Sequence, residues 1–230
     1  LASGPQIIGL GVYIWNARET AEVVALLKQI RPELVVVLGG PEVSYESEQQ
    51  TICEQADYVI SGQGDLAFAE LCRQLLQGER PAEKLITAPP PPLDSLTLPY
   101  GEYRDEDIAH RVIYVEASRG CPFKCEFCLS ALDKSATPFE LERFLDEMER
   151  LYQRGLRHFK FVDRTFNLKV DNSLRILAFF LERLDERLFL HFELIPDHLP
   201  ERLKEAIQRF PEGSLQFEIG IQSLNPEVQQ

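Results

Sequence analysis

Short apolar segments alternate with helix-like segments along this 230-residue chain, and this alternation limits its fold more than any other feature. In the first 80 residues the apolar runs are rich in β-branched residues, as buried strands are, and they lie at 6–12, 34–38 and 58–60. Helix-like segments follow them at 19–30, 44–55 and 65–77. Buried strands that alternate with helices favour a parallel sheet with helices on both faces. The sequence therefore predicts a Rossmann-like, open parallel α/β sheet in residues 1–80.

A run of four prolines interrupts this alternation. Residues 88–93 read Ala-Pro-Pro-Pro-Pro-Leu, and consecutive prolines neither continue a helix nor join a central strand. We therefore predict a proline-rich linker over residues 81–110, between two domains. The alternative is a surface loop within a single domain.

The alternation resumes after this linker. Strands are predicted at 112–116, 158–162, 189–194 and 215–221. Helices are predicted at 137–154, 173–184 and 201–210, the first opening on a capping box from Thr137 to Glu140 with Pro138 at its first position. Four strands and three helices match part of a (β/α)6-type barrel, and a four-strand arc cannot close. We expect an incomplete barrel in residues 111–230, with further segments beyond both ends of the chain.

Charge and composition exclude several classes of partner. The chain has 24 Lys and Arg against 37 Asp and Glu, and its net charge of −13 repels nucleic-acid phosphates and anionic lipids. No window holds 18 uninterrupted apolar residues, so no membrane span is predicted. The five cysteines are an odd number for a disulfide framework. We therefore expect a cytoplasmic protein with free thiols and with neither a nucleic-acid nor a membrane partner.

Cys121, Cys125 and Cys128 follow the first strand of the second half in a C-x3-C-x2-C spacing. In a loop, this spacing lets three thiolates bind one small object. A structural zinc site has four ligands, whereas three thiolates on an iron–sulfur cube leave one iron open. Zinc stays an alternative that needs a fourth ligand from elsewhere in the chain. The candidates for it are Cys53, Cys72, His110, His158, His191 and His198.

This cysteine pattern, at the end of a first barrel strand and with Phe127 before the last cysteine, resembles that of the radical S-adenosylmethionine (SAM) superfamily. The resemblance covers residues 110–230. It implies a [4Fe-4S] cluster on the three cysteines, with an open iron that binds the amino and carboxylate groups of SAM. Reduction by one electron would cleave SAM to methionine and a 5′-deoxyadenosyl radical, while the protein supplies position and electrostatics.

The same resemblance implies SAM contacts at the ends of the later strands, where βα barrels place their active residues. Asp163 would accept a hydrogen bond from the SAM ammonium group, and Asn167 would assist. The other candidates are Phe127 near the adenine, Glu193, Glu218, Gln222 and Ser223. For the carboxylates the alternative is an ion pair at the barrel rim, as between Asp163 and Arg164. For Phe127 it is core packing. No catalytic residue is assigned.

The first half resembles the cobalamin-binding domain that precedes the barrel in one branch of this superfamily. Glycines at strand-to-helix turns let a ligand approach the backbone, and the matching ones are Gly39, Gly40, Gly62 and Gly64. Tyr13 would line the same pocket, with a place in the core as the alternative. The family's Asp-x-His-x-x-Gly loop, whose His ligates cobalt, is missing, and we expect it upstream of this chain.

These resemblances imply a cobalamin-dependent radical SAM enzyme that transfers a methyl group to a small-molecule substrate. An electron donor of the flavodoxin or ferredoxin type would reduce its cluster. One alternative is a cobalamin-dependent radical oxidative cyclase of the tetrapyrrole type. The other is a non-catalytic protein that binds cobalamin or SAM.

Overall fold

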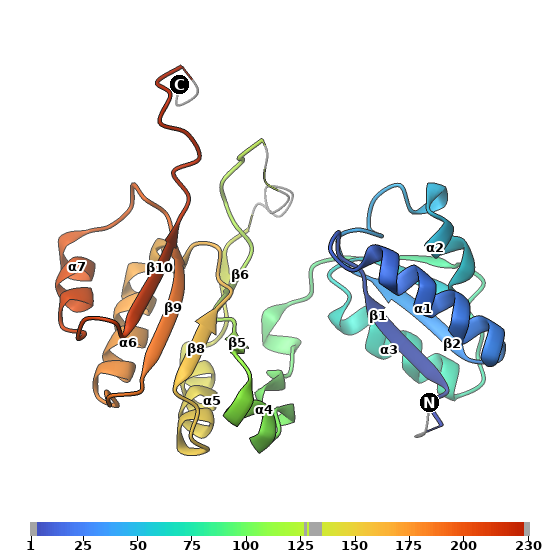
Figure 1. Cartoon of the computed structure of the whole chain (residues 1–230), viewed down its shortest axis with the longest axis horizontal. Coiled ribbons are helices and arrows are strands. Elements are labelled where there is room, and N and C mark those ends of the chain that lie inside the picture. Colours follow the sequence, from blue (N-terminus) through green and yellow to red (C-terminus); the bar gives the residue numbers. More distant parts are fainter. Residues whose placement is uncertain (1–3, 127, 129–134, 228–230) are drawn as a thin grey trace. The chain divides into compact units, whose positions relative to one another are not determined.

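The computed structural model describes residues 4–126, 128 and 135–227. The chain forms two compact units, residues 1–96 and 97–230, each with its own parallel sheet (Figure 1). In the described residues, no helix is both long enough and apolar enough to cross a membrane.

The first unit is built on four parallel strands in the order β1-β2-β3-β4. These strands are β1 (Ile7–Gly11), β2 (Val35–Gly39), β3 (Tyr58–Gly62) and β4 (Leu85–Ala88). The helices of this unit are α1 (Ala17–Ile30), α2 (Thr51–Gln55) and α3 (Asp65–Leu76), with 3-10 turns η1 (Ser47–Gln49) and η2 (Leu93–Ser95). The first three strands lie where the apolar runs predict them. The helix expected at 44–55 is reduced to η1 and the short α2.

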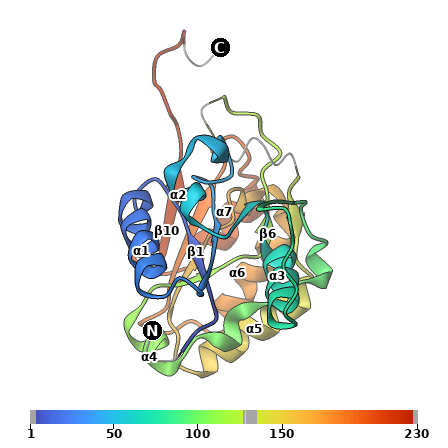
Figure 2. The same cartoon turned by 90° about the vertical axis from the view of Figure 1, so that its right-hand side faces the viewer.

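Side chains of the central strand β2 alternate between two buried faces. Val36 and Leu38 pack in the cluster that includes α1 and α2, whereas Val35 and Val37 pack in the cluster that includes α3. Helices α1 and α3 accordingly lie on opposite sides of the sheet (Figure 2). A strand with two apolar faces is typical of a parallel sheet covered on both sides, and the predicted α/β architecture is confirmed.

Strand β4 lies inside the segment predicted as a linker. It pairs with β3 in parallel, with Ile86 beside Ile60 and Ala88 beside Gly62. Residues 85–88 therefore belong to the first sheet. The strand is short and mostly exposed, and the prolines directly behind it conceal its signal in the sequence.

The other end of the predicted linker belongs to the second unit. There, η3 (Pro99–Glu102) and α4 (Asp105–His110) precede the second sheet. The buried Tyr100 hydroxyl accepts a hydrogen bond from the Glu116 backbone N–H over 2.8 Å and donates one to the Glu116 carbonyl over 3.3 Å. Burial raises the pKa of Tyr100. The expected linker over residues 81–110 is thus wrong at both ends, because short packed segments flank the prolines.

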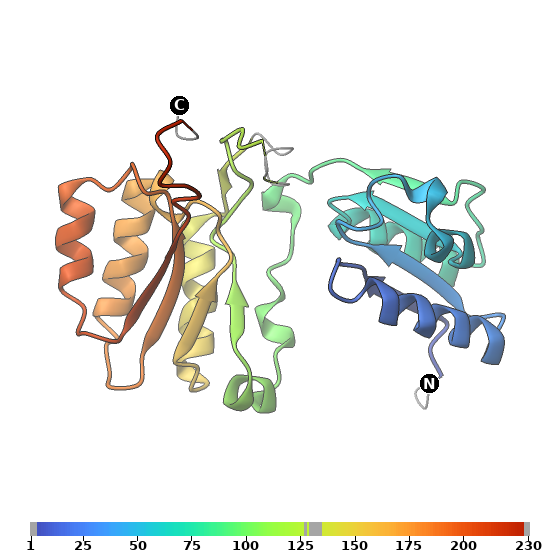
Figure 3. The ribbon, with the colours of Figure 1, turned by 45° about the horizontal axis from the view of Figure 1, so that its top comes forward.

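The second sheet also has four parallel strands, in the order β10-β9-β8-β5. They are β5 (Ile113–Val115), β8 (His158–Phe161), β9 (Phe189–Leu194) and β10 (Leu215–Ile219). Helices α5 (Leu141–Gln153), α6 (Val170–Leu181) and α7 (Glu201–Gln208) cover one face (Figure 3), and a 3-10 turn, η5 (Phe166–Leu168), precedes α6. The predicted open arc of four strands and three helices is confirmed in the described residues.

Aromatic side chains fill the core between this sheet and its helices. Phe161 of β8 contacts Phe144 of α5, Phe180 of α6 and Phe192 of β9, with ring centroids 4.5 to 6.2 Å apart. All four rings are fully buried. Their tilted and edge-on packing is the arrangement that aromatic pairs favour, and it fixes α5 and α6 against β8 and β9.

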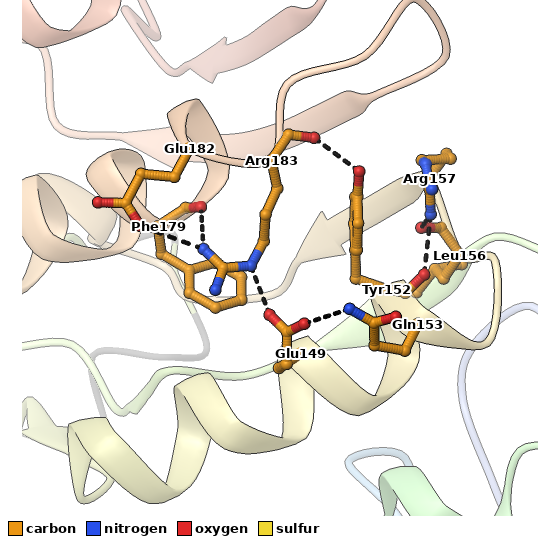
Figure 4. A network of polar contacts seen from close by, with 8 residues as sticks. All are labelled: Glu149, Tyr152, Gln153, Leu156, Arg157, Phe179, Glu182 and Arg183. Atoms are coloured by element: carbon orange, nitrogen blue, oxygen red, sulfur yellow. Dashed lines mark hydrogen bonds and ion pairs between the residues drawn. The ribbon is translucent and has the colours of Figure 1, made fainter.

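Polar contacts hold α5 to the segment that ends α6 (Figure 4). The Arg183 guanidinium lies 3.7 Å from the Phe179 ring centroid and forms an ion pair with Glu149 of α5. The Tyr152 hydroxyl donates a hydrogen bond to the Arg183 carbonyl over 2.8 Å. A cation–π contact of this kind contributes about 0.5–1 kcal/mol at exposed sites.

Helix α5 begins later than the predicted capping box. Thr137–Pro138 form strand β7, which pairs in antiparallel with β6 (Ser118–Arg119). The N-cap is Glu140, whose carboxylate accepts hydrogen bonds from the backbone N–H groups of residues 142 and 143 over 2.9 and 2.7 Å. These bonds lower the pKa of Glu140. The sequence conceals β7 because its partner strand lies far away along the chain.

Replacing Tyr100 with Phe should reduce the free energy of unfolding of the second unit by about 1–3 kcal/mol, because the Glu116 N–H is left without its partner in a buried place. Denaturant unfolding followed by circular dichroism measures this loss. Tyr103→Phe is the matched control, since its hydroxyl bond to the Tyr114 carbonyl is long, at 3.4 Å. Equal stability of the two variants would contradict an anchoring role for Tyr100.

Candidate functional site

Three free thiols lie on the loop between β6 and β7. Cys121 and Cys128 are partly exposed, and Cys125 is exposed. Gly120, at φ 92°, turns the chain directly before Cys121. The Cys128 backbone N–H donates a hydrogen bond to the Cys125 carbonyl over 3.0 Å. The loop projects from the same end of the second sheet as the segment after β10 (Figure 1).

The donors of this loop fit an iron–sulfur cube better than a zinc ion. Among the described residues, no three Cys, His, Asp or Glu side chains lie close enough to hold one metal ion. An iron–sulfur cube does not need three ligands around a single metal ion, because each of its three thiolates binds a different iron. A zinc site would require four ligands around one point, and the described residues bring no three together.

Asp163, which follows β8, anchors the base of the cysteine loop. Its side chain is 2% exposed and accepts hydrogen bonds from the Ala117 backbone N–H over 3.0 Å and from the Ser118 hydroxyl over 2.6 Å. The sequence predicts that this carboxylate meets the SAM ammonium group or pairs with Arg164. The structure instead directs both of its oxygens to the segment just before Cys121, because β5 and β8 are neighbours in the sheet.

Two opposing effects act on the Asp163 carboxyl. Burial raises its pKa to about 7, while the hydrogen bonds from residues 117 and 118 lower it. Desolvation penalises the charged form, and hydrogen bonds to that form favour it. The balance leaves a carboxyl group that titrates near neutral pH beneath the cysteine loop.

Two further contacts brace the same loop base. The Arg119 guanidinium binds both carboxylate oxygens of Glu116, over 2.9 and 2.8 Å. The Phe139 backbone N–H donates to the Ala117 carbonyl over 2.9 Å. Together with Asp163, these contacts fix the chain on both sides of the β6–β7 ribbon from which the cysteines project.

Paired charges occupy the sheet face opposite the helices. Glu193 of β9 and Glu218 of β10 are neighbours in register. Arg164 Nη1 lies 3.4 Å from Glu193, whereas Lys160 Nζ and His191 Nε2 lie 3.4 and 2.8 Å from Glu218 Oε1. The ion pairs considered as the alternative are therefore present for both carboxylates, and Arg164 pairs with Glu193 rather than with Asp163.

Asn167 has a packing role that the sequence does not reveal. The side chain is fully buried, and its Nδ2 donates to the carbonyls of Ile195 over 2.9 Å and His198 over 2.5 Å. Its Oδ1 accepts from the Ile195 N–H over 2.8 Å. Both amide donors thus hold the loop after β9, and the expected assistance to SAM has no donor left.

The last two SAM candidates lie in the segment that follows β10. Gln222 is exposed and has a left-handed backbone, with φ at 64°. The Ser223 hydroxyl oxygen accepts from the Asn225 N–H over 3.1 Å. Phe127 lies outside the described residues.

A cavity of about 550 Å³ opens at the carboxyl end of the first sheet. The cavity is lined by all four glycines that the sequence predicts as ligand contacts: Gly39, Gly40, Gly62 and Gly64. Parallel strands end at one edge of a sheet, and this brings the four turns together.

Bare backbone forms much of the cavity wall. Gly11 lies beside Gly39 in register, and both line the cavity. At Gly40, with φ 108°, a Cβ would lie 2.5 Å from the Val12 carbonyl oxygen. At Gly62, with φ 92°, it would lie 2.3 Å from the Ala88 carbonyl oxygen. These two positions accept only glycine, because a side chain there would clash with the backbone of the neighbouring strand ends.

Sequence reasoning missed Phe68 of α3. Its ring lines the cavity and lies 2.8 Å from where a Cβ on Gly9 would stand. Its spacing in the sequence could have identified it: Phe68 follows Gly64 by four residues, so on a helix it lies one turn past a predicted cavity residue. Tyr13, which the sequence places in the pocket, is not among the residues that line the cavity, although its ring lies 3.4 Å from where a Cβ on the lining residue Gly11 would stand.

The two remaining cysteines belong to the first unit. Cys53 is buried in the core of the first unit, and Cys72 lies partly buried on α3. Burial raises the pKa of both thiols. A raised pKa disfavours the thiolate that binds metal, which fits their interpretation as inert core residues.

The raised pKa of Asp163 predicts a stability that falls with rising pH. The protonated form is favoured by folding, so its contribution is fully present below about pH 4 and is lost as pH rises through about 7. The limiting slope is ~1.4 kcal/mol per pH unit. Denaturant unfolding at several pH values should show this decline, and Asp163→Asn should remove it. Asp197→Asn, at an exposed carboxylate, should leave it unchanged. An identical slope in all three proteins would exclude Asp163 as its source.

Two family models match the chain. The B12 binding domain matches residues 1–72, and the Radical SAM superfamily matches residues 115–230. Among curated relatives, an uncharacterized methyltransferase from Pyrococcus horikoshii is 31% identical over 75% of this chain and 43% of its own length. The cobalamin-dependent radical SAM methyltransferase TokK from Streptomyces tokunonensis is 27% identical over 71% of this chain and 28% of its own length. The chain thus spans less than half of the length of either relative.

The solved structures show the same fold. The radical SAM methyltransferase TsrM from Kitasatospora setae, with tryptophan and a SAM analogue bound, matches 98% of this chain with a TM-score of 0.72. The match covers 50% of TsrM at 18% sequence identity. The cofactors expected from the sequence, SAM with a [4Fe-4S] cluster and cobalamin, are those of the two matched families. The chain belongs to the radical SAM superfamily and has a B12-binding domain ahead of its radical SAM region.

Proposed function

We propose that this protein is a cobalamin-dependent radical SAM enzyme that transfers a methyl group to a small-molecule substrate. One observation carries the proposal: a single chain presents three free thiols in C-x3-C-x2-C spacing at the carboxyl end of one sheet and a glycine-walled cavity at the carboxyl end of another. Relatives named as methyltransferases support methyl transfer as the reaction.

Each unit contributes its own residues. When bound, the cluster would supply an electron to cleave SAM, and cobalamin would carry the methyl group. Cys121, Cys125 and Cys128 would hold the cluster, and Asp163 acts as a positioning residue that fixes their loop from below. Glu193 and Glu218 offer carboxylates to the SAM ammonium group at the carboxyl end of the second sheet.

The segment after β10 supplies Gln222 and Ser223 as polar contacts for SAM, and Phe127 is assigned to the adenine. The glycine turns of the first sheet would hold cobalamin. An electron donor of the flavodoxin or ferredoxin type completes the cycle, and the free thiols suit the reducing cytoplasm.

Changing Cys121, Cys125 and Cys128 to Ala should abolish the binding of iron and sulfide, because a cube cannot be held without its thiolates. Iron and sulfide analysis after anaerobic reconstitution measures this. Cys53→Ala and Cys72→Ala are matched controls that keep the metal content, since burial raises the pKa of both thiols and disfavours the thiolate that binds metal. Unchanged iron in the triple variant would overturn the cluster assignment.

The reconstituted protein, given SAM, cobalamin and a strong reductant, should release 5′-deoxyadenosine, and the triple cysteine variant should release none. Chromatography of the quenched mixture measures the product. Absence of 5′-deoxyadenosine from a protein with a full cluster would leave only the non-catalytic alternative.

A larger side chain at Gly39 should block cobalamin. The closest atom to a Cβ there is the Ile60 carbonyl oxygen at 3.7 Å, an ordinary contact, so Gly39→Leu enters the cavity without straining the fold. We expect at least a tenfold loss of cobalamin affinity, measured by absorbance titration. Gly101→Leu, at a glycine with open space around it in the second unit, should bind like the parent protein. If Gly39→Leu bound cobalamin as tightly as the parent protein, the cavity would be excluded as the binding site.

A further inference from the structure

A small cavity lies between the base of the cysteine loop and the first turn of α6. About 20 Å³ of it is open to the centre of a water molecule. Its polar wall comes from three segments of the chain: Ser118 at the loop base, Asp163 and Thr165 after β8, and Asn172 of α6. A buried water needs about 10–15 Å³ of such space, so the cavity has room for one.

One residue of the cavity wall carries a buried hydroxyl group without a partner. Thr165 is 4% exposed, and its Oγ1 makes no hydrogen bond in the described part of the chain. The neighbouring hydroxyl of Ser173, which also lines the cavity, is directed to the Phe166 carbonyl over 2.6 Å. Buried hydroxyl groups are almost always bonded to protein or to ordered water, because a polar group without a partner is unfavourable there. Thr165 therefore needs a partner that the described residues do not supply.

The charges around the cavity favour a neutral ligand. The Asp163 carboxylate would repel an anion. A cation is disfavoured by the Lys169 ammonium group and by the N-terminus of α6, where Lys169 is the N-cap. The carboxylate accepts one hydrogen bond at each oxygen, from Ala117 and Ser118, and each oxygen can accept another. A water molecule meets both needs, because it can donate to Asp163 and accept from Thr165 at once.

We propose that this cavity is a binding site for one ordered water molecule, which bridges the Thr165 hydroxyl and the Asp163 carboxyl group. The water would add a third contact to the carboxyl group that fixes the base of the cysteine loop. It would thereby tie that base to the segment between β8 and α6. The site is built from this chain's own residues and does not depend on either cofactor.

A crystal structure of the whole chain tests the site directly. The electron density should show a water molecule within about 3.2 Å of both Thr165 Oγ1 and a carboxyl oxygen of Asp163. Thr165→Val has nearly the same shape but lacks the hydroxyl, so this density should be lost. Thr165→Ser keeps the hydroxyl and should keep the water.

The sign of a stability change gives a second test. If a water binds Thr165, exchanging the hydroxyl for a methyl group removes a hydrogen bond, and the melting temperature of the second unit should fall by about 3–5 °C in Thr165→Val. If the hydroxyl has no partner, the same exchange removes a desolvated polar group, and the melting temperature should stay or rise. Thr97→Val, at an exposed threonine of the second unit, is the matched control and should melt like the parent.

The outcomes decide the proposal independently of the proposed function, because no cofactor enters either measurement. A cavity without density, in crystals that show ordered water elsewhere in the protein interior, would overturn it. Density that persists unchanged in Thr165→Val, or a melting temperature of that variant at or above the parent's, would overturn it as well. An anomalous signal at the site after a rubidium soak would assign the cavity to a monovalent cation and exclude the water.

Discussion

One buried carboxylate joins the parts of the second unit on which the cysteine loop depends. Asp163 follows β8, and its oxygens accept hydrogen bonds from residues 117 and 118, which follow β5. A carboxyl group in this place is costly to desolvate, and its hydrogen bonds offset only part of that cost, as the raised pKa shows. The carboxylate accepts hydrogen bonds from the Ala117 backbone N–H and the Ser118 hydroxyl, and these bonds fix the point where the cysteine loop begins.

The two units differ in the surface that they offer to a ligand. In the first, the carboxyl end of the sheet carries glycines, so the backbone itself is the surface that a ligand meets. In the second, the face opposite the helices carries Lys160, His191 and two neighbouring carboxylates. Under the proposed function, the glycine-walled cavity of the first unit would hold cobalamin. Charged side chains in register suit a ligand such as SAM, which carries an ammonium, a carboxylate and a sulfonium.

The sequence predicts those parts of the molecule that depend on local patterns. Apolar runs locate the long strands, the cysteine spacing locates the loop, and glycines at strand ends locate the cavity. Strands β4 and β7 escape detection because each consists of a few residues beside prolines and is defined by a distant partner. Asp163 and Asn167 are identified as important polar residues, but their partners depend on how neighbouring strand ends are placed. Contacts between segments that are distant in the sequence cannot be predicted from the spacing of residues along the chain.

The ion pairs of Glu193 and Glu218 do not exclude a role in binding. Arg164 is 58% exposed and lies 3.4 Å from Glu193, and Lys160 lies at the same distance from Glu218. Glu193 and Lys160 are only 24% and 26% exposed, so both pairs are partly shielded from water. Under the proposed function, a ligand ammonium group would compete with the two cations for the same oxygens. Removing the cations altogether would leave two carboxylates side by side in register, which repel. The pairs thus balance the charge of both carboxylates, and under the proposed function a cationic ligand would take the place of Arg164 or Lys160.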